Sequence, residues 1–368
     1  MHVVMLPWLA FGHVLPFTEF AKRVARQGHR VTFLSTPRNT RRLIDIPPGL
    51  ADLIRVVDVQ LPRVEHLPEH AEATIDLPSD DLRPYMRRAY DAAFERVLSR
   101  LLQAEEKAGS RPDWVLVDYA SYWAPAAAAR HGVPCAFLSL FGAAALSFFG
   151  SPETLLGLGR HAKTEPAHLT AVPEYVPFPT TVAYRSYEAR ELFEPGMVPD
   201  DSGASGLPFI WAFRAPTDST SGSLPEGFEE RVAGRGVVCR GWVPQVRFLA
   251  HASVGRFLTH AGWNSIAEGL AQGVRLVLLP LVFEQGLNAR NLVDKKIGVE
   301  VARDEHDGSF AADDIAAALR MVMVEDEGEG FRAKVEEVAK VFGDDEVNDQ
   351  CVREFLLHLS EHSKKNQG

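Results

Sequence analysis

The sequence predicts an α/β protein whose two halves are each a parallel sheet covered by helices. The chain opens with a buried strand (His2–Leu6), a helix and a second buried strand (Val31–Leu34), which is the order of a βαβ unit. A further strand, turn and helix follow one another from Arg256 to Gly273. A chain of 368 residues is long enough for two domains of ordinary size. These observations together favour two α/β domains over one.

The first half continues the alternation of strands and helices. Pro16 suits an early helical position after a loop at Pro7–Leu15, and Gly28 ends that helix. Leu82–Lys107 has the apolar spacing of the longest amphipathic helix in the chain. The residues expected on its core face are Tyr85, Ala89, Ala92, Phe94, Val97 and Leu101. A strand, a helix and a strand follow, at Asp113–Asp118, Trp123–His131 and Val133–Leu140.

The second half repeats the pattern after a loop-rich stretch at Ser151–Gly203. Its short apolar runs predict strands at Pro208–Phe213, Gly236–Cys239, Arg256–Thr259, Leu276–Leu279 and Gly298–Ala302. Its last amphipathic runs predict helices at about Ala311–Val324, Phe331–Phe342 and Gln350–Ser360. We expect Asp344-Asp345-Glu346 to form a solvated connector before the last helix.

Composition and charge exclude several classes of function. The hydrophobic fraction of 46% and the charged fraction of 24% are those of a globular protein. A net charge of −10 argues against binding to nucleic acids or anionic membranes, because both need a cationic surface. Cys135, Cys239 and Cys351 lie far apart, and no Asp/Glu/His cluster has ligand spacing, so neither a disulfide framework nor a metal site is indicated. The longest apolar run, Ala136–Gly150, is too short for a transmembrane segment, so a cytoplasmic protein is expected.

The stretch from Trp242 to Gln285 carries the clearest chemical signal. A strand ends at His260, and a tight turn leads into a helix that Asn264 or Ser265 can cap. A helix N-terminus presents unpaired N–H groups and a partial positive charge, so it readily holds a phosphate. The pattern therefore indicates a phosphate site at this turn.

Side chains on both sides of the turn suit the remaining parts of a nucleotide sugar. Glu268, about one turn into the helix, can accept hydrogen bonds from ribose hydroxyl groups. Trp242 and Gln245 offer a stacking face and an amide group for a base. Glu284 and Gln285 follow the next strand and can bind hydroxyl groups. These residues indicate a site for a nucleotide that carries a sugar.

Trp242–Gln285 resembles the signature box of plant UDP-sugar-dependent glycosyltransferases along its whole length, with HAGWNS where the family pattern has HCGWNS. The resemblance implies a GT-B fold, in which two Rossmann-like domains face a cleft. It implies that Trp242 stacks on uracil beside Gln245, that Glu268 holds the ribose, and that Glu284 and Gln285 contact the donor sugar. His260, Asn264 and Ser265 would hold the diphosphate. The expected donor-binding set is completed by Val243, Gly262 and Trp263.

His13 and Asp118 are candidates for the reaction itself. Gly12-His13 follows the first strand, and Asp118 ends a strand expected to be its neighbour, so both lie at carboxyl ends of the sheet. An imidazole oriented by a carboxylate is a common general base, because the carboxylate fixes its tautomer and stabilises its protonated form. The segments FGHVLPF and VDYASYW also resemble the catalytic-histidine and activating-aspartate motifs of the family, which implies these roles for His13 and Asp118.

The resemblance also implies the reaction. It is an inverting transfer of a sugar from a UDP-sugar to a hydroxyl group, with no metal ion and no other cofactor. The overall pattern resembles the branch that acts on small lipophilic plant metabolites or their glycosides, with UDP-rhamnose or UDP-glucose as the donor. The expected partners are therefore a UDP-sugar and a small acceptor, and the protein is expected to be a monomer.

The chain departs from the family pattern near Gly203. Family members have a linker, a strand, a Gly-Ser loop and a helix there, whereas Pro199–Gly203 runs almost directly into Ala204–Pro208 in this chain. Because a βαβ unit takes about 30 residues or more, we expect an internal deletion that removes the first strand and helix of the second domain. The predicted domains are residues 1–203 for the acceptor, residues 204–345 for the UDP-sugar, and a C-terminal helix and tail at 346–368.

Two other functions remain open at this point. If the deletion damages the donor domain, the protein is a catalytically weak or inactive UDP-binding relative. A dehydrogenase is a more distant alternative. Gly157–Ala162 matches the G-x-G-x-x-A dinucleotide pattern, but no predicted strand precedes it.

Overall fold

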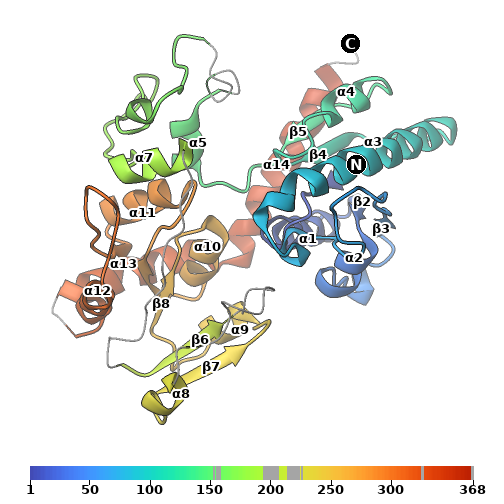
Figure 1. Ribbon diagram of the computed structural model, residues 1–368. Coiled ribbons are helices and arrows are strands. Elements are labelled where there is room, and N and C mark those ends of the chain that lie inside the picture. The colour runs from blue at the N-terminus through green and yellow to red at the C-terminus, as the bar shows by residue number, and fades with distance from the viewer. Residues whose placement is uncertain are drawn as a thin grey trace. The chain divides into compact units, whose positions relative to one another are not determined.

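The computed structural model describes residues 1–151, 154, 159–193, 207–213, 224, 227–324 and 327–365. These residues form two compact units (Figure 1). One unit contains Met1–Leu140 and the C-terminal helix from Asp345, and the other contains the described residues from Phe141 to Asp344. The predicted domain boundaries, at residues 203 and 345, divide the chain differently. The predicted deletion site near Gly203 and the first two residues of the dinucleotide-like segment, Gly157-Leu158, lie outside the described residues.

The first unit is built on a five-stranded parallel sheet with the order β3-β2-β1-β4-β5. Its strands are β1 His2–Leu6, β2 Arg30–Ser35, β3 Ile54–Asp58, β4 Trp114–Val117 and β5 Cys135–Phe137. β1 is central, so Val4 pairs with Thr32 on one side and with Val115 on the other. All residues of β1 are buried, as expected for a parallel strand that is covered on both faces.

Alternate residues of β1 pack against different helices of this unit. Val4 and Leu6 belong to a cluster with residues of α3 and α4, whereas Val3 and Met5 belong to a cluster with residues of α1 and α14. The two-residue period of a strand produces this division of the core. The helices of the unit are α1 Phe11–Arg26, α2 Pro37–Leu43, α3 Arg83–Lys107, α4 Ala124–Ala129 and α14 Asp345–Lys365.

α3 confirms the predicted long helix, but the face that it buries is rotated from the predicted one. Ala89 and Phe94 are buried as expected. The other predicted core residues, which are exposed or only partly buried, are Tyr85, Ala92, Val97 and Leu101. The buried stripe includes Tyr90, whose hydroxyl group forms a hydrogen bond of 2.5 Å with the Ser121 hydroxyl group. This bond allows a polar side chain to occupy the core.

The second unit contains two parallel sheets. The larger has the order β10-β9-β8, and the smaller pairs β6 with β7. Their strands are β6 Phe209–Phe213, β7 Gly236–Arg240, β8 Arg256–Thr259, β9 Arg275–Leu278 and β10 Gly298–Glu300. Each predicted strand of this half therefore forms, with ends close to those expected. Within the described ranges, no strand pairing joins β6 to β8.

Helices cover both faces of the larger sheet. Leu276 and Leu278 of β9 pack with residues of α10, α11 and α13, whereas Val277 packs with residues of α12. The helices of this unit that follow β6 are α8 Phe228–Arg231, α9 Gln245–Leu249, α10 Trp263–Ala271, α11 Gln285–Asp294, α12 Ala312–Val324 and α13 Glu327–Phe342. The predicted helices near residues 311–342 are thus confirmed.

The segment from Phe141 to Phe193 packs on the second unit. Its described elements are α5 (Ala143–Phe149), a 3-10 helix (Pro166–Leu169) and α7 (Ser186–Phe193). Leu287 of α11 is fully buried in the same hydrophobic cluster as residues of these elements. Apolar contact therefore attaches this segment to α11.

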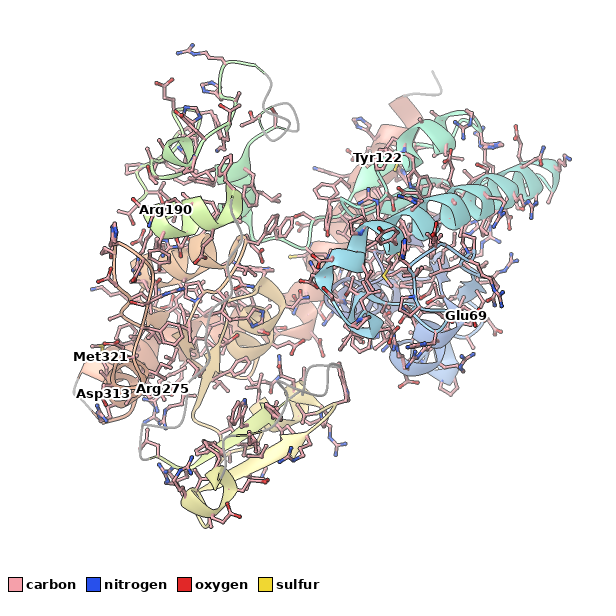
Figure 2. All side chains as sticks on the ribbon, viewed as in Figure 1. Glu69, Tyr122, Arg190, Arg275, Asp313 and Met321 are labelled. Atoms are coloured by element: carbon pink, nitrogen blue, oxygen red, sulfur yellow. The ribbon has the colours of Figure 1, made fainter. Side chains whose placement is uncertain are left out.

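Ion pairs strengthen the same attachment. Arg290 of α11 pairs with Glu188 of α7 and, at 3.0 Å, with Glu300 of β10. Arg190, which Figure 2 labels on α7, donates a hydrogen bond to the carbonyl group of His306. These contacts explain why the segment belongs to the second unit, although the sequence predicted it in the first domain.

α1 and α14 begin well before their predicted starts. α1 begins at Phe11, inside the predicted loop, because hydrogen bonds to the Ala10 carbonyl group close its first turn. Pro16 consequently lies within α1. α14 begins at Asp345, so Asp345 and Glu346 of the predicted connector lie in its first turn, where Asp345 pairs with Arg23 at 2.6 Å.

Replacement of Leu356 by alanine tests the attachment of α14 to the first unit. Leu356 is 3% exposed in the cluster with Val3 and Met5, so Leu356→Ala should lower the free energy of unfolding by about 2–5 kcal/mol. Leu357 is 61% exposed on the same helix, so Leu357→Ala is the matched control. Chemical denaturation measures both changes. Equal losses for the two variants would contradict the packing of α14 described here.

Candidate active site

The sheet of the first unit brings His13 and Asp118 together. β1 and β4 are parallel neighbours, with Leu6 opposite Val117, so the residues that follow the two strands lie at the same edge. His13 is in the first turn of α1, and Asp118 directly follows β4. The distance from His13 Nδ1 to Asp118 Oδ2 is 2.9 Å. The predicted pairing of the two side chains is therefore confirmed, although His13 lies on a helix and not in a loop.

Backbone N–H groups fix the carboxyl group of Asp118, which is 3% exposed. Its Oδ2 accepts a hydrogen bond from the Trp8 N–H at 2.5 Å, and its Oδ1 accepts one from the Ala120 N–H at 2.8 Å. An ionised carboxylate can only accept hydrogen bonds, so His13 Nδ1 must be the donor in the pair. In the neutral imidazole, Nε2 then carries no proton and can act as a base.

One aromatic side chain contacts the histidine of this pair. The Tyr119 ring lies 5.5 Å from the His13 ring, edge to face, and Tyr119 is largely exposed. Tyr122, labelled beside α4 in Figure 2, is also exposed. Tyr119, Tyr122 and Trp8 were not among the residues predicted for the site. Their only sequence signal was that each follows the end of a strand.

The signature stretch forms a strand, a turn and a helix, but the helix begins earlier than expected. β8 ends at Thr259, Ala261 has a φ of 62°, and Gly262 is the N-cap of α10. The prediction that Asn264 or Ser265 caps this helix is wrong, because both lie inside its first turn. The left-handed backbone at Ala261 turns the chain so sharply that the helix starts at Trp263.

Three predicted donor-binding side chains meet beside α10. Gln245 Nε2 donates a hydrogen bond to Glu268 Oε2 at 2.8 Å and lies 3.5 Å from Ser265 Oγ. Burial raises the pKa of Glu268, and the hydrogen bond from Gln245 partly opposes this effect. Trp242, on the segment before α9, is largely exposed, and the neighbouring Val243 is partly buried.

The His260 imidazole packs closely against Gly262 in the turn. Loss of hydration among neighbouring protein atoms lowers the pKa of His260, although the residue as a whole remains exposed. A lowered pKa favours the neutral imidazole at pH 7. A β-carbon on Gly262 would lie 2.5 Å from His260 Nε2, so a larger residue at position 262 would displace the imidazole from this position.

A second turn, after β9, contains Glu284 and Gln285. Gln285 Oε1 accepts hydrogen bonds from the N–H groups of Leu281 and Val282, each at 2.9 Å. Because Oε1 is used within the turn, the side-chain NH2 group is the part of Gln285 that can bind a ligand, and it does so as a hydrogen-bond donor. Glu284 is the N-cap residue of α11 and is partly buried.

Asn288 connects the two turns, and no sequence pattern predicted this role. Its Nδ2 donates a hydrogen bond of 3.0 Å to the carbonyl group of Ala261, and the residue is almost completely buried. An asparagine one turn into a helix gives no sequence signal for such a bond. The turns that hold His260 and Gln285 are thereby fixed to each other.

The described residues contain no group of three or more His, Cys, Asp or Glu side chains placed to hold a metal ion. None of the described helices is both long enough and apolar enough to span a membrane.

Known proteins resemble this chain over nearly its whole length. UDP-glycosyltransferase 91A1 from Arabidopsis thaliana is 35% identical, and the alignment covers 98% of this chain and 96% of that protein. Soyasaponin III rhamnosyltransferase from Glycine max is 30% identical, with 98% and 96% covered. The family model described as UDP-glucoronosyl and UDP-glucosyl transferase matches residues 201–348. The chain belongs to the UDP-glycosyltransferase family.

The fold agrees with solved structures of plant UDP-glycosyltransferases. The crystal structure of Os79 from O. sativa in complex with UDP has a TM-score of 0.69 and 21% identity, with 97% of this chain and all of that chain covered. The chain thus has the α/β fold of the GT-B plant glycosyltransferases, with parallel sheets. UDP-glycosyltransferases use UDP-sugar donors without a metal cofactor. The branch that this chain matches includes rhamnosyltransferases.

Replacement of Gly262 by alanine tests the geometry of the first turn. The added β-carbon would displace the exposed His260 imidazole and place alanine at the N-cap of α10, so Gly262→Ala should destabilise the protein by about 1 kcal/mol. Gly255 is the matched control, because the nearest atom to its added β-carbon is 3.9 Å away. Denaturant unfolding compares the two variants. A Gly262→Ala protein as stable as Gly255→Ala would mean that the turn differs from this description.

Proposed function

We propose that this UDP-glycosyltransferase moves a sugar from a UDP-sugar to a hydroxyl group of a small lipophilic plant metabolite or of its glycoside, with inversion at the anomeric carbon. The observation that carries the proposal is the hydrogen bond from His13 Nδ1 to the buried Asp118 carboxylate. This bond leaves His13 Nε2 as the free basic nitrogen of the pair.

In the proposed reaction, proton transfer and attack occur together. His13 Nε2 removes the proton of the acceptor hydroxyl group while the oxygen of that hydroxyl group attacks the anomeric carbon from the face opposite UDP. The new C–O bond forms as the bond to the diphosphate oxygen breaks, so configuration inverts and UDP leaves. Asp118 stabilises the imidazolium that forms on His13.

The signature stretch binds the donor in this proposal. Trp242 stacks on uracil with Val243 and Gln245 beside it, and Glu268 accepts hydrogen bonds from the ribose. The first turn of α10 supplies N–H groups to the departing diphosphate. The other residues assigned to the diphosphate are His260, Gly262, Trp263, Asn264 and Ser265. Glu284 and Gln285 bind the hydroxyl groups of the donor sugar.

The donor sugar is rhamnose or glucose, and the acceptor is a lipophilic metabolite or its glycoside. The similarity to Soyasaponin III rhamnosyltransferase supports rhamnosyl transfer to a saponin-like acceptor. Hydrogen bonding by Gln285 is equally compatible with glucose, because its free amide nitrogen can donate to hydroxyl groups of either sugar. The enzyme acts as a cytoplasmic monomer in this proposal.

A catalytically weak UDP-binding relative is the second candidate. The alignment with UDP-glycosyltransferase 91A1 extends over 465 positions, which exceeds the 368 residues of this chain. In the described part of the second unit, β6-β7 and β8-β9-β10 are separate sheets. An alignment longer than the chain contains gaps in the chain, and the second candidate assumes that they include an internal deletion near Gly203. Such a deletion would leave UDP binding with little turnover.

Replacement of His13 by alanine tests the leading proposal. His13→Ala should lower kcat by about 10²–10⁴-fold, because the general base is lost, while UDP affinity stays unchanged. Asp118→Asn should have a similar effect. Its amide can donate to His13 Nδ1 and favour the tautomer with a protonated Nε2, which cannot accept the acceptor proton.

UDP release with UDP-rhamnose and UDP-glucose, over a panel of lipophilic metabolites and glycosides, measures turnover. Asp113→Asn is the control, because Asp113 lies at the opposite end of β4 and binds the His2 N–H. A His13→Ala enzyme with near-normal turnover would refute the proposal. UDP-induced thermal stabilisation of the unaltered chain without any UDP release would favour the second candidate.

A further inference from the structure

The turn between β9 and α11 contains a strained aromatic residue. Phe283 has a φ of 57°, in the left-handed region that bulky side chains seldom occupy. Such a conformation persists only when its surroundings hold it, and it is concentrated at functional sites. Here the two hydrogen bonds to Gln285 Oε1 hold the preceding residues Leu281 and Val282.

Two phenylalanine rings from the segment around α5 hold Phe283 from one side. Its ring centre lies 5.8 Å from that of Phe141 and 5.9 Å from that of Phe149, and these two rings are 6.0 Å apart. We call Phe141, Phe149 and Phe283 the Phe triad. Phe283 nevertheless remains 52% exposed, so part of its ring is open to a ligand.

The Phe triad lies at the second of the two turns to which the proposed function assigns the donor. We call these turns, residues 260–262 before α10 and residues 281–285 at the start of α11, the ligand turns. Gly142 directly follows Phe141, and a β-carbon there would lie 2.8 Å from Trp263 Cε3. The segment Phe141-Gly142 therefore touches the start of α10 through Trp263 and the second turn through Phe283. The hydrogen bond from Asn288 to the carbonyl group of Ala261 fixes the spacing of the two turns.

The second turn offers few polar groups beside this aromatic surface. The Oε1 atom of Gln285 is already bonded, so the pair Glu284–Gln285 presents one carboxylate and one amide nitrogen. A pyranose ring carries hydroxyl groups around its edge and C–H groups on its faces. Binding sites for such molecules combine a few oriented polar groups with an apolar wall.

We propose that Phe283 is a specificity-determining residue, whose exposed ring packs on a C–H face of the donor sugar while Glu284 and Gln285 bind its hydroxyl groups. This inference rests on the proposed function, because it places the donor sugar at Glu284–Gln285. Phe141 and Phe149 are positioning residues, which hold the ring in its strained conformation. Phe283 thus distinguishes a UDP-sugar from UDP.

The test compares the affinities of UDP, UDP-glucose and UDP-rhamnose by titration calorimetry. Phe283→Ala should weaken the binding of at least one UDP-sugar by about tenfold, because the apolar contact to the sugar is lost. UDP affinity should not change, since UDP lacks the sugar. Phe283→Tyr should bind the UDP-sugar with nearly the affinity of the unaltered chain, because tyrosine keeps the aromatic face.

Val282→Ala is the matched control, because Val282 is exposed on the same turn and its N–H still bonds Gln285. It should leave every affinity unchanged. Phe283→Leu keeps apolar bulk in the Phe triad, so it provides a folded comparison if Phe283→Ala does not bind UDP.

Equal losses of UDP and UDP-sugar affinity in both Phe283→Ala and Phe283→Leu would assign Phe283 a purely structural role and overturn the inference. Unchanged UDP-sugar affinity in Phe283→Ala would also overturn it, while leaving the proposed function intact. Failure of the unaltered chain to bind UDP would instead overturn the proposed function, and this inference with it.

Discussion

The proposed chemistry depends on one hydrogen bond, from His13 Nδ1 to Asp118. The carboxyl group is buried and could not be held there as an anion without donors around it, because burial of an unpaired charge is very costly. The N–H groups of Trp8 and Ala120 provide two donors, and His13 provides the third. The bond therefore stabilises the buried acid and, at the same time, sets which imidazole nitrogen is free to accept a proton.

In the second unit, unusual backbone conformations shape the two turns. Each of its two ligand turns contains a residue other than glycine with a positive φ, Ala261 in the first and Phe283 in the second. Asn288 ties the first turn to α11, and Gln285 Oε1 ties the second turn to the start of the same helix. α11 is in turn anchored by Leu287 and by the ion pairs of Arg290. Side chains of α11 thus hold both turns in place.

The sequence predicted those features that follow from strand order and from the signature box. His13 and Asp118 could be paired because parallel strands bring their carboxyl ends to one edge. The sequence could not predict the caps of α10, since the left-handed backbone of Ala261 has no signal in an alanine. Nor could it show that Gln285 uses its side-chain carbonyl oxygen within its own turn, because a glutamine has no sequence signal for that bond. The packing of the segment after Phe141 on α11 was not predictable either, because it is a long-range contact. The buried face of α3 was predicted wrongly because it includes Tyr90. The hydroxyl group of Tyr90 needs a partner inside the core, and the sequence does not show that Ser121 provides it.

The tautomer of His13 tests the central claim most directly. Nitrogen-15 NMR of histidine-labelled protein, with the His13 signals assigned by their loss in His13→Ala, reports which ring nitrogen is protonated. In the neutral imidazole we predict a proton on Nδ1 and none on Nε2, and a reversal in Asp118→Asn. A neutral His13 with its proton on Nε2 in the unaltered protein would contradict the account, because that imidazole could not accept a proton from the acceptor hydroxyl group.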